Sequence, residues 1–344
     1  NARILSTAVG IYDNVFVFPW EHPEARWTPS EKAAISSIIH EYLLGKGRKW
    51  AHGAKFEQEW FHARFGPDIL YKTQWGDTLG QAHVLDERKG KSLDNLTQLN
   101  FGFRIKSISA INVKQLVTTP LHYVLPYNGM DAKYCDALRH IQADRLEEEE
   151  LTKVYEFLND ATPALVMMQA KGVVRNLPAI KQLDKDLDKQ KEQIKTKILN
   201  HPDVVAYRTR SGKFSPTSNP DLVGLFRDHL KLKHPSRQRN GGAWHESFSQ
   251  KEGSGTLYSV DEGALSQFKH PVAKLVLDMR SCIKCHGYVT PLLDNGKYVH
   301  GDGLIHSIYN NYVTVSGRLS SSEPDEQNYP KREHKEIRRV VGCP

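Results

Sequence analysis

The chain has 344 residues, of which 39% are apolar and 25% are charged, a globular mixture long enough to form two or three domains. It holds no apolar stretch of the roughly 18 or more residues that cross a bilayer, so a membrane-spanning helix is excluded. The net charge of +7 at pH 7 suits a polyanionic partner, and the small number of cysteines, four, makes a reducing cytoplasm the expected location.

Residues 1–145 alternate short apolar runs with helical patterns, which is typical of an α/β domain. Residues 4–9 and 15–18 are predicted to pair as a hairpin. Thr28 and Pro29 predict the start of a long helix, because they are a capping residue and a first-turn proline. The other predicted features are the hairpin turn at 12–14, the end of that helix near residue 44, a short strand at 49–52, helices at 55–65, 77–85 and 93–99 with Ser92 as an N-cap, and a helix starting near Asp131.

From about residue 146 the pattern becomes helical. Residues 176–200 predict a long helix with one apolar stripe and charged remaining faces. Residues 201–220 and 233–256 are rich in Pro, Gly, Ser and basic side chains, which predicts loops. After residue 301 the sequence turns extended, with β-branched residues and Ser.

Positive charge gathers between residues 195 and 239, where ten Lys and Arg side chains, Lys213 among them, meet only three Asp. Such a stripe neutralises phosphates and gives a salt-dependent affinity for nucleic acid. A solvated basic face explains the same charges equally well, so both interpretations stay open on charge alone.

The four cysteines are too few and too unevenly spread for a disulfide framework. Cys282-Ile-Lys-Cys285-His286 matches the haem-attachment pattern and half of a zinc site. No second Cys/His pair at zinc-finger spacing follows, and the same segment reads as an amphipathic helix, where Cys is an ordinary packing residue. We therefore interpret these cysteines as core residues.

The most distinctive segment is Ser316-Gly-Arg-Leu-Ser-Ser-Ser-Glu-Pro-Asp-Glu-Gln-Asn-Tyr-Pro330, with Asp302-Gly-Leu-Ile-His306 leading into it. It resembles the segment T-G-R-L-S-S-S-x-P-N-L-Q-N-x-P that enters the palm of family A (DNA polymerase I-like) DNA polymerases. The sequence departs from this pattern at Ser316, Asp325 and Glu326. Because an Asp repels phosphate, we do not expect a DNA contact at position 325.

The resemblance implies that Arg318 and Gln327 contact DNA at the primer terminus. There the minor groove presents similarly placed acceptors on every base pair, so a donor checks geometry without reading sequence. Asn328 offers another neutral donor for the same task. Ser320 and Ser321 either bind phosphates or cap turns, and both interpretations stay open.

Upstream, residues 214–222 resemble a thumb signature whose residues cap a helix that grips the duplex. The resemblance places Arg280 and Lys284 of a later helix towards DNA, and Lys213 adds positive charge beside the signature. Downstream of the palm-entry segment, Arg332 is expected to supply charge for phosphate.

The first domain resembles the 3′–5′ proofreading exonuclease of the same family. Tyr127-Asn-Gly-Met-Asp131 matches its Y-x-x-x-D motif, which implies that Tyr127 orients the attacking water and Asp131 binds metal. His52-Gly-Ala-Lys-Phe-Glu57 stands where H-N-x-K-F-D is usual, so Glu57 is the second expected ligand. The reaction uses two Mg²⁺ ions, which require several carboxylates.

Two features of this domain depart from an intact exonuclease. Gly53 replaces the usual Asn, and the D-x-E motif of the opening strand is absent, since Asp13 and Glu21 have the wrong spacing. Asp77 is expected to fix structure rather than to bind metal. Either the missing carboxylates lie outside this sequence or proofreading is disabled.

The sequence also stops before the family places its palm aspartates and its fingers helix. Because phosphoryl transfer depends on metals held by those aspartates, we expect this chain alone not to polymerise. A split polymerase, in which a second polypeptide supplies the fingers and catalytic palm, is favoured over an experimental fragment, and a phage or other viral genome is where we would expect it.

The predicted fold is an α/β ribonuclease H-like exonuclease domain (1–145), a mainly helical thumb (146–300) and the first β-strands of a palm (301–344). The predicted function is part of a DNA-directed DNA polymerase, a nucleotidyltransferase of bacterial or phage-infected cytoplasm that binds primer–template DNA. The alternatives are a non-catalytic DNA-binding scaffold with a degenerate exonuclease fold and a free-standing exonuclease, in which a thumb has no purpose.

Overall fold

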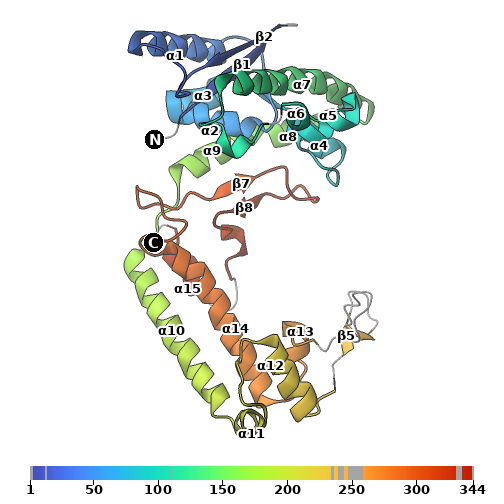
Figure 1. The fold of residues 1–344 in the computed structure, drawn as a ribbon, viewed down its shortest axis with the longest axis vertical. Helices are drawn as coiled ribbons and strands as arrows, with labels where there is room; N and C mark the ends of the chain where they lie inside the picture. The colour runs from blue at the N-terminus through green and yellow to red at the C-terminus, as the bar shows by residue number, and fades with distance from the viewer. Residues whose placement is uncertain are drawn as a thin grey trace. The chain divides into compact units, whose positions relative to one another are not determined.

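A computed structural model describes residues 3–11, 14–109, 111–233, 236–238, 244–246, 259–330 and 335–342. The chain divides into two compact units (Figure 1). Unit 1 consists of residues 1–172 and 306–327, and unit 2 of residues 173–305 and 328–344. The predicted turn residues Tyr12 and Asp13 lie outside the described residues.

Unit 1 is mostly helical, with short paired strands. Its strands are β1 (Ser6–Ile11), β2 (Asn14–Pro19), β3 (Lys49–Ala51), β4 (Trp75–Asp77), β7 (Ile308–Asn310) and β8 (Ser320–Ser322). Its helices are α1 (Pro29–Leu44), α2 (Ala54–Phe65), α3 (Asp68–Lys72), α4 (Thr78–Leu85), α5 (Leu93–Phe101), α6 (Ile105–Ser109), η1 (Val113–Gln115), α7 (Leu121–Glu148), α8 (Thr152–Asp160) and α9 (Thr162–Lys171). The single turn η4 (Glu326–Asn328) follows β8.

Local capping signals place the helices of unit 1 where the sequence predicts them. Thr28 caps α1 by accepting from the backbone N–H of Glu31 at 3.3 Å, and the Glu31 carboxylate accepts from the N–H of Thr28 at 2.8 Å. This reciprocal pair satisfies two of the free amides at a helix start. Ser92 caps α5 by accepting from the backbone N–H of Asn95 at 3.3 Å, so both predicted starts are confirmed.

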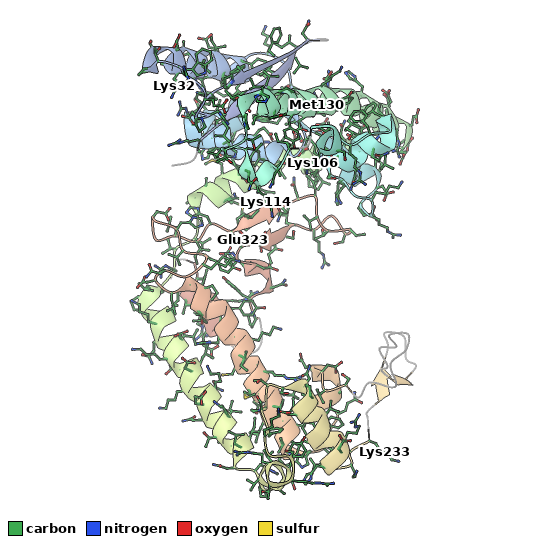
Figure 2. All side chains as sticks on the ribbon, viewed as in Figure 1. Lys32, Lys106, Lys114, Met130, Lys233 and Glu323 are labelled. Atoms are coloured by element: carbon green, nitrogen blue, oxygen red, sulfur yellow. The ribbon has the colours of Figure 1, made fainter. Side chains whose placement is uncertain are left out.

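Helix α7 is the exception, because it begins at Leu121 rather than near Asp131. Pro126 lies inside the helix, where it lacks the N–H that the helix would use. The proline favours a break when the sequence is read alone, and the packing of α7 against the β1–β2 hairpin overrides it. On α7, Asn128 donates from Nδ2 to the Ser6 hydroxyl of β1 at 2.9 Å. Figure 2 shows the side chains of this unit, including Met130 on α7 and Lys106 on α6.

The strands of unit 1 pair two by two. β1 and β2 form the predicted antiparallel hairpin, β3 and β4 are parallel, and β7 and β8 are antiparallel. A core of buried side chains, Trp20, Ile39, Ala54, Ile69 and Trp75 among them, fills the space between the hairpin and helices α1 to α3. Among the described residues no larger sheet forms, so the ribonuclease H-like sheet stays a prediction.

Unit 2 is built on two long helices that run side by side (Figure 1). Its elements are α10 (Leu177–Leu199), α11 (Pro202–Ser211), α12 (Asn219–Val223), η2 (Gly224–His229), β5 (Ser236–Gln238), β6 (Trp244–Glu246), α13 (Glu262–Leu265), α14 (Pro271–Val289), η3 (Thr290–Leu292) and α15 (Glu336–Val340). The predicted helix over 176–200 is confirmed as α10, with Asn176 as its N-cap. The loop predicted over 233–256 contains the short strands β5 and β6, which pair antiparallel.

The apolar stripe of α10 packs against α14. Ile180 and Leu187 are buried in one cluster with Cys282 and Cys285, and Ile194 lies in the next cluster. Both cysteines are 1% exposed, which fits the interpretation of the Cys-x-x-Cys pattern as core residues. Among the described residues, no helix is both long and apolar enough to span a membrane.

Candidate nucleic-acid interface and exonuclease-like site

The palm-entry segment (residues 316–330) contains β8, which pairs with β7 in an antiparallel hairpin of unit 1. Ile308 pairs with Ser322 and Asn310 with Ser320. Asn311, directly after β7, donates from Nδ2 to the Thr162 hydroxyl at 2.9 Å and so anchors the hairpin to the start of α9. Asn311 is buried, and burying an amide is favourable only when it is hydrogen-bonded, so this anchor is specific.

The connection between β7 and β8 presents Arg318. Gly317 has a φ of 69°, a left-handed conformation that favours glycine, and its N–H donates to the Thr314 carbonyl at 3.2 Å. The Thr314 hydroxyl donates to the Arg318 carbonyl, which closes the turn from the other side. The Arg318 side chain is exposed on this fixed turn.

Ser321 organises the segment that follows the hairpin. It is 6% exposed, donates its hydroxyl to Asp325 Oδ1 at 3.0 Å, and accepts from the backbone N–H of Gln327 at 3.2 Å. Its hydroxyl is therefore engaged inside the segment, where it positions Gln327. The side chains of Gln327 and Asn328 are exposed, and Ser320 is half-buried.

The expected thumb contacts of unit 2 divide into two kinds. Arg280 donates from Nη2 to Asn219 Oδ1 at 2.8 Å and from Nη1 to the Val260 carbonyl, so it ties α14 to α12 and to the start of α13. Burial lowers the pKa of its guanidinium. Lys284 and Lys213 are exposed. Arg332 lies outside the described residues.

Residues 214–222, which resemble a thumb signature, contain a helix cap. Ser218 is the N-cap of α12 and accepts from the N–H of Asp221, whose carboxylate accepts from the N–H of Ser215 at 2.8 Å. These two side-chain bonds fold residues 215–221 into one compact turn.

Tyr127 and Asp131 lie one turn apart on α7, as the Y-x-x-x-D spacing predicts. Burial raises the pKa of Asp131 to about 6, while a hydrogen bond from Tyr127 and the charge of Lys106 act in the opposite direction. The pKa of Tyr127 is raised, first by burial and then by the negative charge of Asp131. The phenol is therefore a neutral donor held on the carboxylate.

Glu57 is the second expected ligand, on the first turn of α2. Its Oε2 atom is shielded from solvent and has no hydrogen-bond partner among the described residues. Burial raises the pKa of Glu57 to about 8, and the nearby charges of Asp77 and Asp131 add to the rise. A buried carboxyl with this perturbation beside other acids is a candidate for function.

Asp77 has a structural role. Its carboxylate accepts from the backbone N–H groups of Gly53 at 2.8 Å, Ala54 at 3.0 Å and Leu79 at 2.9 Å, so it joins the start of α2 to the start of α4. These bonds occupy both of its oxygens, which agrees with the expectation that Asp77 fixes structure. Gly53 has a φ of 80°, a conformation in which the Asn usual at this position is strained less than most residues.

The exonuclease-like residues do not fit a two-metal centre. Clamping a water and a leaving oxygen with two cations needs several carboxylates. Among the described residues the two expected ligands are Glu57 and Asp131, while the neighbouring Asp77 is engaged by backbone amides. Within the described ranges, the one group of three or more ligand atoms within 4.8 Å of one another is Asp184, Asp188 and His286 in unit 2. Sequence analysis missed that group, although the four-residue spacing of the two Asp residues was a visible signal.

Comparison with known proteins agrees with the palm-entry motif. The sequence model of DNA polymerase family A matches residues 179–344. A thermostable DNA polymerase I from Thermus filiformis is 29% identical over 192 residues, which cover 55% of this chain and 20% of the relative. The DNA polymerase of Escherichia phage T5 is 25% identical over 295 residues, which cover 79% of this chain and 32% of the relative. The chain thus spans about a fifth to a third of the length of these relatives.

A solved structure shares the fold. The POL domain of Pol1 from M. smegmatis, in complex with DNA primer-template and dNTP, superposes with a TM-score of 0.61 at 21% sequence identity. The match covers 95% of this chain and 49% of that chain. At this level of identity the match establishes the fold alone.

Proposed function

Because this chain belongs to DNA polymerase family A, we propose that it forms the part of a DNA-directed DNA polymerase that binds the primer–template duplex during template-directed synthesis. The observation that carries the proposal is the β7–β8 hairpin, which holds Arg318 exposed on a glycine turn and positions Gln327 through Ser321. The polymerase domain that shares its fold was solved with primer-template DNA.

The chemistry of these two side chains suits a check on base-pair geometry. A guanidinium and an amide donate hydrogen bonds to the minor-groove acceptors, which lie at similar places on all four base pairs. Such contacts depend on the shape of a correct pair and not on its sequence. A replicative enzyme needs that property at the primer end.

Unit 2 supplies a second, electrostatic part of the proposed interface. Exposed Lys213 and Lys284, together with the basic stretch over 195–239, neutralise phosphates without reading bases. Arg280 acts through the fold instead, since its guanidinium is bonded to Val260 and Asn219. Lys284 is accordingly the side chain of α14 that we assign to DNA.

Fluorescence anisotropy with a labelled primer–template duplex tests this proposal. We expect Arg318→Ala and Gln327→Ala each to weaken binding by about tenfold, because a good groove contact contributes about 1–3 kcal/mol. Arg88→Ala is the matched control, since Arg88 is an exposed arginine of the same unit and its loss changes the net charge equally. Equal affinity of Arg318→Ala and Arg88→Ala for the duplex would remove the hairpin from the interface.

We further propose that residues 1–145 form a proofreading-type exonuclease domain in which Tyr127, Asp131 and Glu57 are the remaining active-site residues. The alternative, a DNA-binding scaffold whose exonuclease fold has decayed, is favoured by one observation: the Asp77 carboxylate is engaged by backbone amides, which leaves Glu57 and Asp131 as the two candidate metal ligands. Degradation of single-stranded 3′ ends by the complete polymerase decides between them. An unchanged rate in Asp131→Asn supports the scaffold, and a large loss supports excision.

The expected split arrangement is a further part of the proposal. Nucleotide incorporation, with Mg²⁺ as its metal, then requires a second polypeptide with the fingers and the palm aspartates. Co-purification of such a polypeptide with this chain is the test. Incorporation of nucleotides by purified residues 1–344 alone would contradict it.

A further inference from the structure

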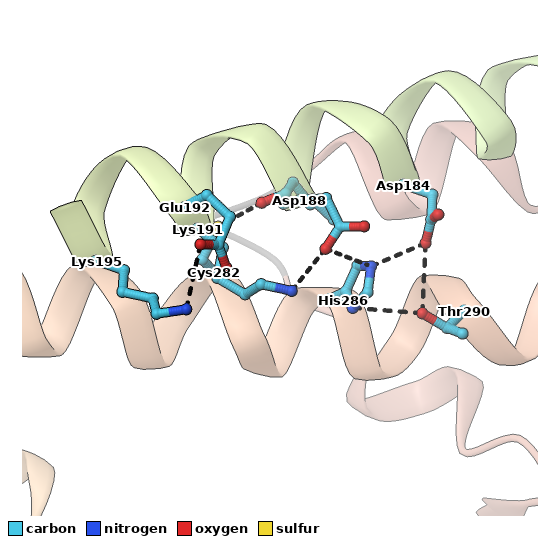
Figure 3. A network of polar contacts seen from close by, with 9 residues as sticks. Asp184, Asp188, Lys191, Glu192, Lys195, Cys282, His286 and Thr290 are labelled. Carbon is cyan, nitrogen blue, oxygen red and sulfur yellow. Dashed lines mark hydrogen bonds and ion pairs between the residues drawn. The ribbon is translucent and has the colours of Figure 1, made fainter. Parts of the chain in front are cut away.

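A polar cluster in unit 2 has no role in the proposed duplex interface. Asp184 and Asp188 lie on α10, and His286 faces them from α14 (Figure 3). A spacing of four residues puts both carboxylates on one face of α10. We propose that these three side chains bind a divalent cation of the zinc class, which joins α10 to α14.

The distances in the cluster match shared coordination. His286 Nε2 lies 3.0 Å from Asp184 Oδ1 and 3.6 Å from Asp188 Oδ1. Ligand atoms of a tetrahedral zinc ion, each about 2.0–2.1 Å from the metal, lie about 3.3–3.4 Å from one another. The two observed distances bracket that value, and all three ligand atoms lie within 4.8 Å of one another.

The imidazole nitrogen Nε2 lies within ion-pair distance of both carboxylates without a well-aligned hydrogen bond to either. His286 Nε2 is shielded from solvent and, in the part of the chain that the structure describes, lacks a hydrogen-bond partner even though Asp184 Oδ1 is 3.0 Å away. The oxygen therefore lies to the side of the N–H direction. Oxygens that share a metal with a nitrogen also lie to the side of its lone-pair axis, because the ion occupies the axis.

Thr290 favours the tautomer that leaves this nitrogen available. Its hydroxyl oxygen lies 3.5 Å from His286 Nδ1 and donates to Asp184 Oδ1 at 3.4 Å. A hydroxyl that donates to the carboxylate can accept from Nδ1–H, which keeps the lone pair on Nε2. Metal-bound histidines are held by such a partner on the second ring nitrogen.

The charges and ligand types select the cation. Lys191 donates to Asp188 Oδ1 at 2.6 Å, so two carboxylates and one ammonium leave one net negative charge beside the imidazole. One imidazole with carboxylates suits zinc and its neighbours, whereas Mg²⁺ prefers octahedral oxygen ligands and retains its waters. Asp188 is 52% exposed, which leaves an entry path and room for a water as the fourth ligand.

Cobalt titration of the full chain tests the site, because Co²⁺ takes the place of zinc and its visible absorption reports tetrahedral coordination. We expect a saturable band at one equivalent, displaced by Zn²⁺ and retained in excess Mg²⁺. In Asp184→Asn and His286→Gln the band disappears. In Glu192→Gln it stays, because Glu192 is a carboxylate of the same helix that pairs with Lys195 instead.

Thr290→Val keeps all three ligands, and we expect it to weaken Co²⁺ binding by about tenfold, the usual effect of removing the partner of a metal-bound histidine. Thermal unfolding in EDTA checks that every variant folds, and Zn²⁺ should raise the midpoint of the wild type but not of Asp184→Asn. A band that persists in Asp184→Asn and His286→Gln, or its absence in the folded wild type, overturns the proposal. The cluster is then an ion pair of histidine with aspartate.

Discussion

At the scale of single residues, Glu57 couples the stability of the protein to pH. Its pKa is 4.5 when solvated and about 8 in the folded protein, so between these values the folded state keeps a proton that the unfolded state releases. Stability linked to this group is therefore complete below pH 4.5 and is lost as the pH rises towards 8. Asp131, whose folded pKa is about 6, contributes with the same sign over a lower range.

Glu57→Gln should remove this loss, because the amide does not ionise. In EDTA we expect the variant to unfold at a higher temperature than the wild type at pH 8.5 and at a similar temperature at pH 5. A gain of about 1 kcal/mol corresponds to roughly 2–4 °C. Unfolding temperatures that fall in parallel with pH in both proteins would show that Glu57 is not buried in this environment.

Arg280 and Lys284 lie four residues apart on α14 and should behave differently. Arg280→Ala breaks two hydrogen bonds to Val260 and Asn219, and we expect it to lower the free energy of unfolding by about 1–3 kcal/mol in urea titrations. Lys284 is exposed, so Lys284→Ala should change the free energy of unfolding by less than about 0.5 kcal/mol. Equal stability losses in the two variants would argue against the bonds of Arg280.

At the scale of elements, the β7–β8 hairpin depends on the hydroxyl of Ser321. Ser321→Ala removes its bonds to Asp325 and to the Gln327 amide, so we expect a destabilisation of about 1 kcal/mol together with weaker duplex binding. Ser320→Ala is the neighbouring control, and the position of Gln327 does not depend on it. If Ser320→Ala reduces duplex affinity more than Ser321→Ala does, the serines bind phosphate groups of the DNA rather than stabilise the turn.

The elements most accurately predicted from sequence are those whose signals are local. Thr28, Ser92 and Asn176 start their helices as predicted, because a cap acts within one turn. The predicted start of α7, near Asp131, is wrong because the packing of the helix against β1 and β2 outweighs the effect of Pro126. The pairing of β3 with β4 joins segments far apart in the chain, and no local pattern reports it.

The candidate sites also divide into features with a local sequence signal and features set by tertiary folding. The Tyr127–Asp131 spacing and the exposure of Arg318 follow from a motif on one segment. The burial of Ser321 and the ties of Arg280 required the structure, because their partners are set by tertiary folding. The cluster of Asp184, Asp188 and His286 is brought together by the packing of α10 on α14, so the spacing of its two Asp residues is visible in the sequence and the position of His286 is not.

At the scale of the whole molecule, the net charge of +7 predicts that duplex binding weakens steeply with salt. Loss of one phosphate contact should reduce the slope of log K against log salt by about one. We expect this change in Lys284→Ala, whereas Arg318→Ala should lower affinity with a smaller change of slope, because its contact is with base edges. Anisotropy titrations at several salt concentrations measure both, and identical slopes in Lys284→Ala and the wild type would remove Lys284 from the interface.

Duplex binding at the primer end is tested most directly by photocross-linking from the tip of the hairpin. Benzoylphenylalanine in place of Arg318 should cross-link a primer–template duplex at the last few base pairs before the primer 3′ end, while the same probe in place of Arg88 should not. Cross-links from position 318 that spread evenly along the duplex, or that are no more frequent than those from position 88, would contradict the assignment of this hairpin to the primer terminus.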